Sequence, residues 1–65
     1  MTFREIEKIL LSNGWYFVDA RGSHKHYKHP QRQGKITIPC HRGDLDKRTA
    51  KTILKQAGIQ GVDVR

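Results

Sequence analysis

The amino-terminal residues carry the hydrophobic pattern of an amphipathic helix. One apolar stripe recurs at helical spacing among charged residues and comprises Phe3, Ile6 and Leu10. Thr2 and Glu5 have the spacing of a capping box, in which each side chain accepts from a backbone amide at the helix start. Gly14 follows Asn13 and suits the left-handed conformation that ends many helices. We therefore expect a first helix from Thr2 to Asn13.

The next segment predicts two strands joined by a tight connection. Trp15–Val18 is aromatic and β-branched, which favours a strand. Arg21–Ser23 contains a glycine and predicts a turn into a second strand at His24–His29.

A third strand follows a polar segment. Pro30–Gly34 is rich in turn-forming residues and is expected to form a hairpin loop. Lys35–Ile38 alternates polar and apolar residues, so Ile36 and Ile38 should face inward. Pro39 fits the end of this strand.

The last clear pattern is a second amphipathic helix. Its apolar positions at helical spacing are Ala50, Ile53, Leu54 and Ala57. Asp46 is the expected N-cap, with its carboxylate accepting from amides of the first turn. Gly58 is expected to cap the other end. Residues 59–65 contain Val62 and Val64 and fit either a short strand or a tail.

The order helix, three antiparallel strands, helix predicts an α+β fold. Two amphipathic helices can cover one face of the sheet and leave the other open. The same α-β-β-β-α order occurs in double-stranded-RNA-binding domains. Sixty-five residues make one thin-cored domain, 1–65, without room for a separate cofactor domain.

Charge narrows the class of partner. Lys and Arg number 13 and Asp and Glu 6, so the formal net charge is +7 with neutral histidines. Such a surface attracts RNA, DNA, an anionic membrane or an acidic protein. Charge alone does not separate an enzyme from a binding protein.

Cysteine content and hydropathy indicate the compartment. The single cysteine, Cys40, allows no internal disulfide and fits a reducing cytosol. No apolar run approaches the ~20 residues of a membrane span. The first residues lack the apolar core of a secretory signal. We expect a cytoplasmic protein without a membrane partner.

Three of the four histidines lie in the second strand. Because alternate side chains of a strand share a face, its residues divide into two sets. Tyr27 is the natural core residue, so its set should face the helices. The expected inner set is Lys25, Tyr27 and His29, and the expected open set is His24, His26 and Lys28.

An exposed imidazole among cations suits RNA cleavage. A neutral histidine can take the proton of the ribose 2′-hydroxyl, and nearby Lys or Arg can stabilise the developing phosphorane charge. DNA lacks this hydroxyl, and the reaction requires no metal or other cofactor. His24 is the candidate, because Gly22 permits a sharp turn just before it.

Other readings of these residues remain open. A histidine in a basic hairpin commonly does no more than contact water or a phosphate. The possible metal donors are His24, His26, His29, Cys40 and His41, but their spacing matches no closed zinc motif. Cys40 beside His41 is a still weaker candidate as a nucleophile, and a buried or half-buried thiol is the role expected for it. A noncatalytic double-stranded RNA-binding module and a DNA-binding basic protein are further alternatives.

The second helix offers a possible phosphate contact at its start. The run Lys47–Lys51 is similar to the Lys-Lys-x-Ala-Lys stretch with which double-stranded-RNA-binding domains hold phosphates. A charged first turn on a solvated helix face is equally ordinary.

Taken together, the motifs closely resemble the HicA toxin family. The matching segments, in order, are Asn13-Gly14-Trp15, Gly22-Ser23-His24, Tyr27-Lys28-His29-Pro30, Ile36-Thr37-Ile38-Pro39, Asp44-Leu45 and Thr49–Ile59. The resemblance implies a double-stranded-RNA-binding-like fold and a ribosome-independent ribonuclease that cuts messenger RNA and stops growth. It implies that the histidine of the Gly-Ser-His motif, His24, is catalytic.

The resemblance also implies a partner. A HicB antitoxin would bind the toxin, block this region and contact DNA through its own DNA-binding domain. By charge complementarity, it should present acidic groups.

The residues expected to contact RNA are Arg21, Ser23, Lys25, His26, Lys28 and Lys47.

Overall fold

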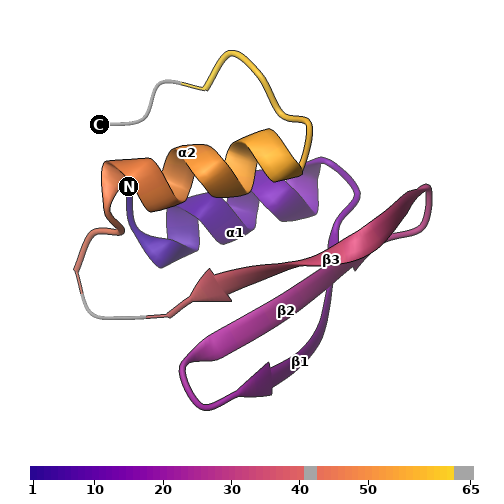
Figure 1. Cartoon of the computed structure of the whole chain (residues 1–65), viewed down its shortest axis with the longest axis horizontal. Helices are drawn as coiled ribbons and strands as arrows, with labels where there is room; N and C mark the ends of the chain where they lie inside the picture. The colour runs from indigo at the N-terminus through magenta and orange to yellow at the C-terminus, as the bar shows by residue number, and fades with distance from the viewer. Residues whose placement is uncertain (41–42, 63–65) are drawn as a thin grey trace.

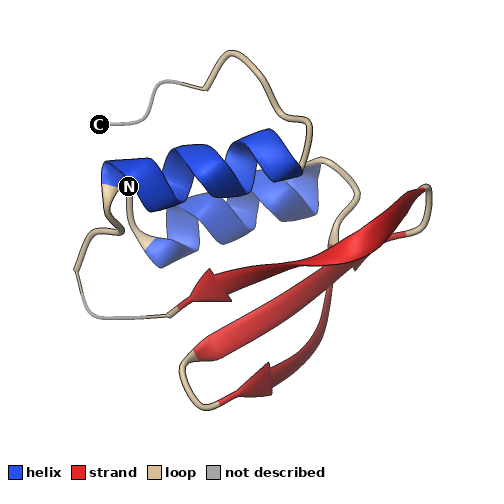
Figure 2. Cartoon of the chain, in the orientation of Figure 1, coloured by secondary structure: helices blue, strands red, loops and turns tan. Residues whose placement is uncertain are grey.

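The computed structural model of the chain describes residues 1–40 and 43–62. Its elements are α1 (Phe3–Ser12), β1 (Tyr16–Arg21), β2 (His24–His29), β3 (Arg32–Pro39) and α2 (Lys47–Gln56). The strands form one antiparallel sheet in the order β1-β2-β3. Both helices lie side by side on one face of it (Figures 1 and 2). The predicted α+β fold is confirmed.

Helix α1 begins and ends as its sequence predicts. The Thr2 hydroxyl accepts from the Glu5 amide at 3.2 Å, and the Glu5 carboxylate accepts from the Thr2 amide at 3.3 Å. Asn13 is the C-cap, and Gly14 follows with a φ of 92°. The buried residues of the helix are Phe3, Ile6 and Leu10.

Strand β1 starts one residue later and ends three residues later than expected. Pairing with β2 continues to Arg21, which lies opposite His24, before the two-residue turn at Gly22-Ser23. The register shifts between Phe17 and Asp19, so Val18 forms a β-bulge.

The predicted hairpin loop at Pro30–Gly34 is wrong. His29 pairs with Arg32, which leaves a turn of two residues, and Arg32 to Gly34 belong to β3. A register shift separates this pair from the Tyr27–Ile36 pair, and Gly34 has a φ of 83°. Its turn-like character therefore serves a bulge inside the strand rather than the loop.

Helix α2 packs with the predicted face but lacks the predicted side-chain cap. Asp46 is the N-cap residue, yet its carboxylate accepts no hydrogen bond from the first turn. The side chain is exposed, so its carboxylate stays hydrated at little cost. The helix ends at Gln56 with Ala57 as its C-cap, and Gly58 follows with a φ of 70°.

The core lies between the helices and the inner face of the sheet. Tyr27, Ile36 and Ile38 are fully buried from the sheet side, and Ile6 and Leu10 from α1. The Tyr27 hydroxyl donates a hydrogen bond to the Glu7 carboxylate. Burial of the ring, and after it this hydrogen bond, raise the pKa of Tyr27 above its ordinary range. One buried tyrosine thus connects β2 to α1.

Strand β1 is a poorly covered edge. Tyr16, Phe17 and Val18 are each more than 40% exposed, although the Phe17 ring meets Tyr27 edge-on at 5.8 Å. On the face of the sheet that points away from α1 and α2, the described residues form no helix (Figure 1).

The ends of the chain add little regular structure. Residues 59–62 form no strand, and Val64 lies outside the described residues. Neither of the described helices is long and apolar enough to cross a membrane.

Candidate ribonuclease site

The turn between β1 and β2 presents His24 at the start of its strand. Gly22 has a φ of 57°, which favours glycine and lets the chain reverse in two residues. The Ser23 carbonyl accepts from the Cys40 amide at 2.6 Å, so the turn is tied to the end of β3. This short, anchored connection holds His24 and Arg21 in direct cross-strand register.

His24 lies exposed on the open face. Neighbours across a strand pair on one face are about 5 Å apart at Cβ, so the Arg21 guanidinium lies within reach of any phosphate that His24 contacts. Among residues 1–40 and 43–62, nothing forms a hydrogen bond with the His24 ring. No described residue therefore competes with a ligand for either ring nitrogen.

His26, on the same face, is paired instead. Its Nδ1 lies 2.6 Å from Oδ1 of Asp19 on β1. The hydrogen bond to His26 is the main cause that lowers the pKa of the Asp19 carboxyl, with smaller contributions from the charges of Arg21 and Lys35. The His26 side chain is 14% exposed, less than an open face suggested, whereas that of Asp19 is 56% exposed.

His29 has a structural role on the inner face. Its Nδ1 accepts from the Gln31 amide at 3.0 Å, so Nε2 carries the hydrogen and donates to the Asn13 carbonyl at 3.0 Å. The ring also meets Trp15 edge-on at 5.3 Å. A Cβ on Gly14 would lie 2.7 Å from Nε2, so glycine permits this close approach. His29 joins the β2–β3 turn to the end of α1.

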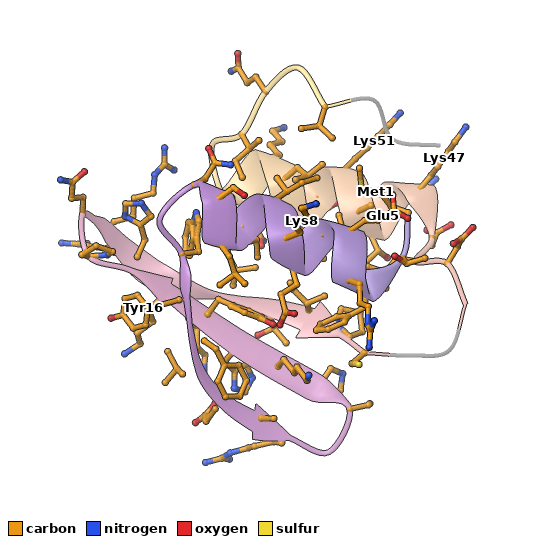
Figure 3. All side chains as sticks on the ribbon, turned by 180° about the vertical axis from the view of Figure 1, so that it is seen from behind. Met1, Glu5, Lys8, Tyr16, Lys47 and Lys51 are labelled. Atoms are coloured by element: carbon orange, nitrogen blue, oxygen red, sulfur yellow. The ribbon has the colours of Figure 1, made fainter. Side chains whose placement is uncertain are left out.

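The predicted RNA contacts do not all gather around His24. Arg21, Ser23, His26 and Lys28 lie on the turn or on the open face. Lys25 lies on the inner face, with its ammonium 4.7 Å from the centre of the Phe3 ring. Lys47 projects from α2 in the other layer, beside Lys51 and away from the sheet, as Figure 3 shows.

The possible metal donors are not brought together. Within the described part of the chain, no three histidine, cysteine or acidic side chains form a cluster that could hold a metal ion. His29 faces away from His24 and His26, and His41 lies outside the described residues.

Two features of the structure go beyond what the sequence predicts. Asp19 was not a candidate, because only the bulge at Val18 aligns it with His26. A groove along α2 is lined by one acidic residue, Thr52 and four cations, namely Asp46, Thr52, Lys47, Arg48, Lys51 and Lys55. The run Lys47–Lys51 predicts part of this groove, whereas its extension along the helix to Thr52 and Lys55 is seen only in the structure.

A family model and a solved structure agree on what this chain is similar to. The sequence profile described as "HicA toxin of bacterial toxin-antitoxin" matches residues 3–59. The fold is similar to that of a chain in a toxin-antitoxin complex from Streptococcus pneumoniae, with 37% identity and a TM-score of 0.79. That alignment covers 91% of this chain and 98% of the other. Comparison with curated proteins gives no match.

Proposed function

Because this chain belongs to the HicA toxin family, we propose that it is a toxin endoribonuclease that cuts messenger RNA in the cytoplasm. The observation that carries the proposal is the exposed His24 ring, free of partners in the described residues and in register with Arg21. The net charge of +7 supports an RNA substrate.

His24 acts on the ribose adjoining the bond that is cut. It removes the proton of the 2′-hydroxyl, and the oxygen attacks the neighbouring phosphorus. The 5′-oxygen leaves, so the products are a 2′,3′-cyclic phosphate and a 5′-hydroxyl. The nucleophile belongs to the RNA itself, so this step requires no metal ion.

Cations on the open face hold the phosphate. Arg21 is opposite His24 and stabilises the charge that develops on the phosphorane oxygens. Lys28, His26 and the Ser23 hydroxyl extend the same surface. Lys25 and Lys47 remain predicted contacts, and they require RNA that reaches beyond this face.

A HicB-type antitoxin neutralises the toxin by covering the same surface. The similarity to a chain from a toxin-antitoxin complex supports such a partner. Acidic groups on the antitoxin would complement the cations around His24 and speed association. An antitoxin bound there would exclude RNA by steric overlap.

Purified protein tests the activity directly. Wild-type protein should cut a messenger RNA and leave a DNA of the same sequence intact, because DNA has no 2′-hydroxyl. His24→Ala should abolish cleavage and growth arrest while folding and antitoxin binding persist. His29→Gln is the matched control, since it also removes a β2 histidine but from the inner face.

The competing candidate is a noncatalytic RNA-binding module. The cation-lined groove on α2 favours it, because such a groove can hold a phosphate backbone without chemistry. Wild-type protein that shifts duplex RNA in a gel but cuts no RNA would decide for this module and against the enzyme.

A further inference from the structure

The cleavage step moves two protons, and His24 accounts for one. When the 2′-oxygen attacks, its proton goes to a base, and the departing 5′-oxygen needs a proton from an acid. One imidazole cannot fill both roles in the same step. A second group on the open face is therefore required, if the proposed function holds.

His26 lies at the right spacing for this second role. It is two residues from His24 on β2. Lys25 lies between the two histidines and faces the helices. Alternate strand residues share a face and are about 6.6 Å apart. Two imidazoles at this spacing can flank one phosphodiester, with one near the attacking oxygen and the other near the leaving oxygen.

Asp19 holds the His26 ring in a form that can donate. The carboxylate accepts at 2.6 Å from Nδ1–H. In the doubly protonated ring, the proton that can be given away is therefore the one on Nε2. A carboxylate in this position also balances the charge of a doubly protonated ring. His24 has no such acidic partner among the described residues, so its environment differs from that of His26.

Other charged and polar groups near the His26–Asp19 pair come from all three strands. Arg21 on β1 and Lys35 on β3 act on Asp19 through their charges, and Thr37 lies opposite His26 on β3. His24 and Lys28 share the face within β2. Asp19 is therefore the one acidic side chain among the groups that face His26 in the described structure.

We propose that His26 is the general acid of the cleavage step and that Asp19 is its positioning residue. His24 accepts the 2′-hydroxyl proton as the bond from the 2′-oxygen to phosphorus forms. The bond from phosphorus to the 5′-oxygen breaks, and Nε2 of His26 gives its proton to that oxygen. The step ends with His24 protonated and His26 neutral, and exchange with water restores both.

An RNA with a sulfur in place of the 5′-oxygen at the mapped cleavage site tests the acid directly. A thiolate leaves without needing a proton, so a missing acid no longer matters. His26→Gln should slow cleavage of normal RNA by about 100-fold or more and cleavage of the sulfur-containing RNA by much less. His24→Ala should slow both, and the control His29→Gln should slow neither per folded molecule.

The role of Asp19 is tested by the pH–rate profile. Asp19→Asn keeps an oxygen that can accept from Nδ1 but removes the negative charge, so the alkaline limb of the profile should move to lower pH. Asp19 is largely exposed, so this variant should fold even if His26→Gln does not. An unchanged limb overturns the positioning role.

The remaining outcomes separate this inference from the proposed function. Wild-type protein that cuts no RNA would refute the ribonuclease itself. A wild-type enzyme whose His26→Gln variant cuts normal RNA at the same rate would refute only the acid, as would a folded variant that loses equal factors on both substrates.

Discussion

The two faces of β2 use the same residue types in opposite ways. On the inner face, both nitrogens of His29 are bonded, and the Lys25 ammonium lies over Phe3. On the open face, His26 has one nitrogen bonded and His24 has none within the described residues. Residue type therefore does not reveal the role of a histidine in this strand, whereas its face does.

The contrast also separates stability from chemistry. Inner side chains connect the sheet to α1 and to the segment between α1 and β1. Their loss should therefore lower the free energy of unfolding. Open side chains contact solvent or each other, so their loss should alter reactions with RNA and leave the fold in place. Each of the following substitutions tests one side of this division.

The largest effect is expected at His24. His24→Ala should reduce RNA cleavage by about 100-fold to 10,000-fold, with a free energy of unfolding within about 0.5 kcal/mol of wild type because the side chain is exposed. Single-turnover cleavage and urea denaturation measure the two quantities. A variant that loses both together would place His24 on the structural side.

Tyr27→Phe should lower the free energy of unfolding by about 1.5–3 kcal/mol, because the Glu7 carboxylate loses its hydrogen bond to the buried hydroxyl. It should also change alkaline unfolding. The pKa of Tyr27 is raised in the folded protein above the ordinary 10.0, so the unfolded state releases this proton first. Stability is thus unaffected by this group below pH 10 and falls as pH rises above it.

Denaturation between pH 8 and pH 12 checks the alkaline part of this expectation. The decline should be shallower in Tyr27→Phe than in wild type. Tyr16→Phe is the control, since it removes the hydroxyl of an exposed tyrosine on β1. An equal decline in wild type and Tyr27→Phe would show that another group governs alkaline unfolding.

His29→Gln should lower the free energy of unfolding by about 1–2 kcal/mol, because it disturbs two hydrogen bonds and the contact with Trp15. Its rate of RNA cleavage, corrected for the folded fraction, should match that of wild type. Thermal unfolding followed by tryptophan fluorescence is suitable, since Trp15 is the single tryptophan. A folded variant with no activity would contradict the structural role.

The smallest effects are expected for the two lysines of the strand. Lys28→Met should reduce the salt dependence of RNA binding by about one phosphate contact. Lys25→Met should change it less and instead cost about 0.5–1 kcal/mol of stability through the lost contact with Phe3. Titrations of RNA at several salt concentrations compare them, and equal slopes would show that RNA reaches both faces.

Much of the fold could be predicted because its signals are local. The capping box at Thr2 and Glu5, the stripe in α1 and the alternation in β2 each depend on neighbours within a few residues. The bulges could not be predicted in this way. Gly34 is a turn-forming residue but lies inside β3, because the pairing of His29 with Arg32 closes the hairpin before it.

The sequence by itself determined the order of elements, the inner position of Tyr27 and the outward position of His24, since periodicity sets which residues share a face. The partners of the histidines were decided only by the tertiary structure. Simple alternation would turn Asp19 toward the same face as Phe17, and the bulge at Val18 brings it against His26 instead. A one-residue shift in strand pairing exchanges the faces of all later side chains, and no local pattern in β1 marks where that shift occurs.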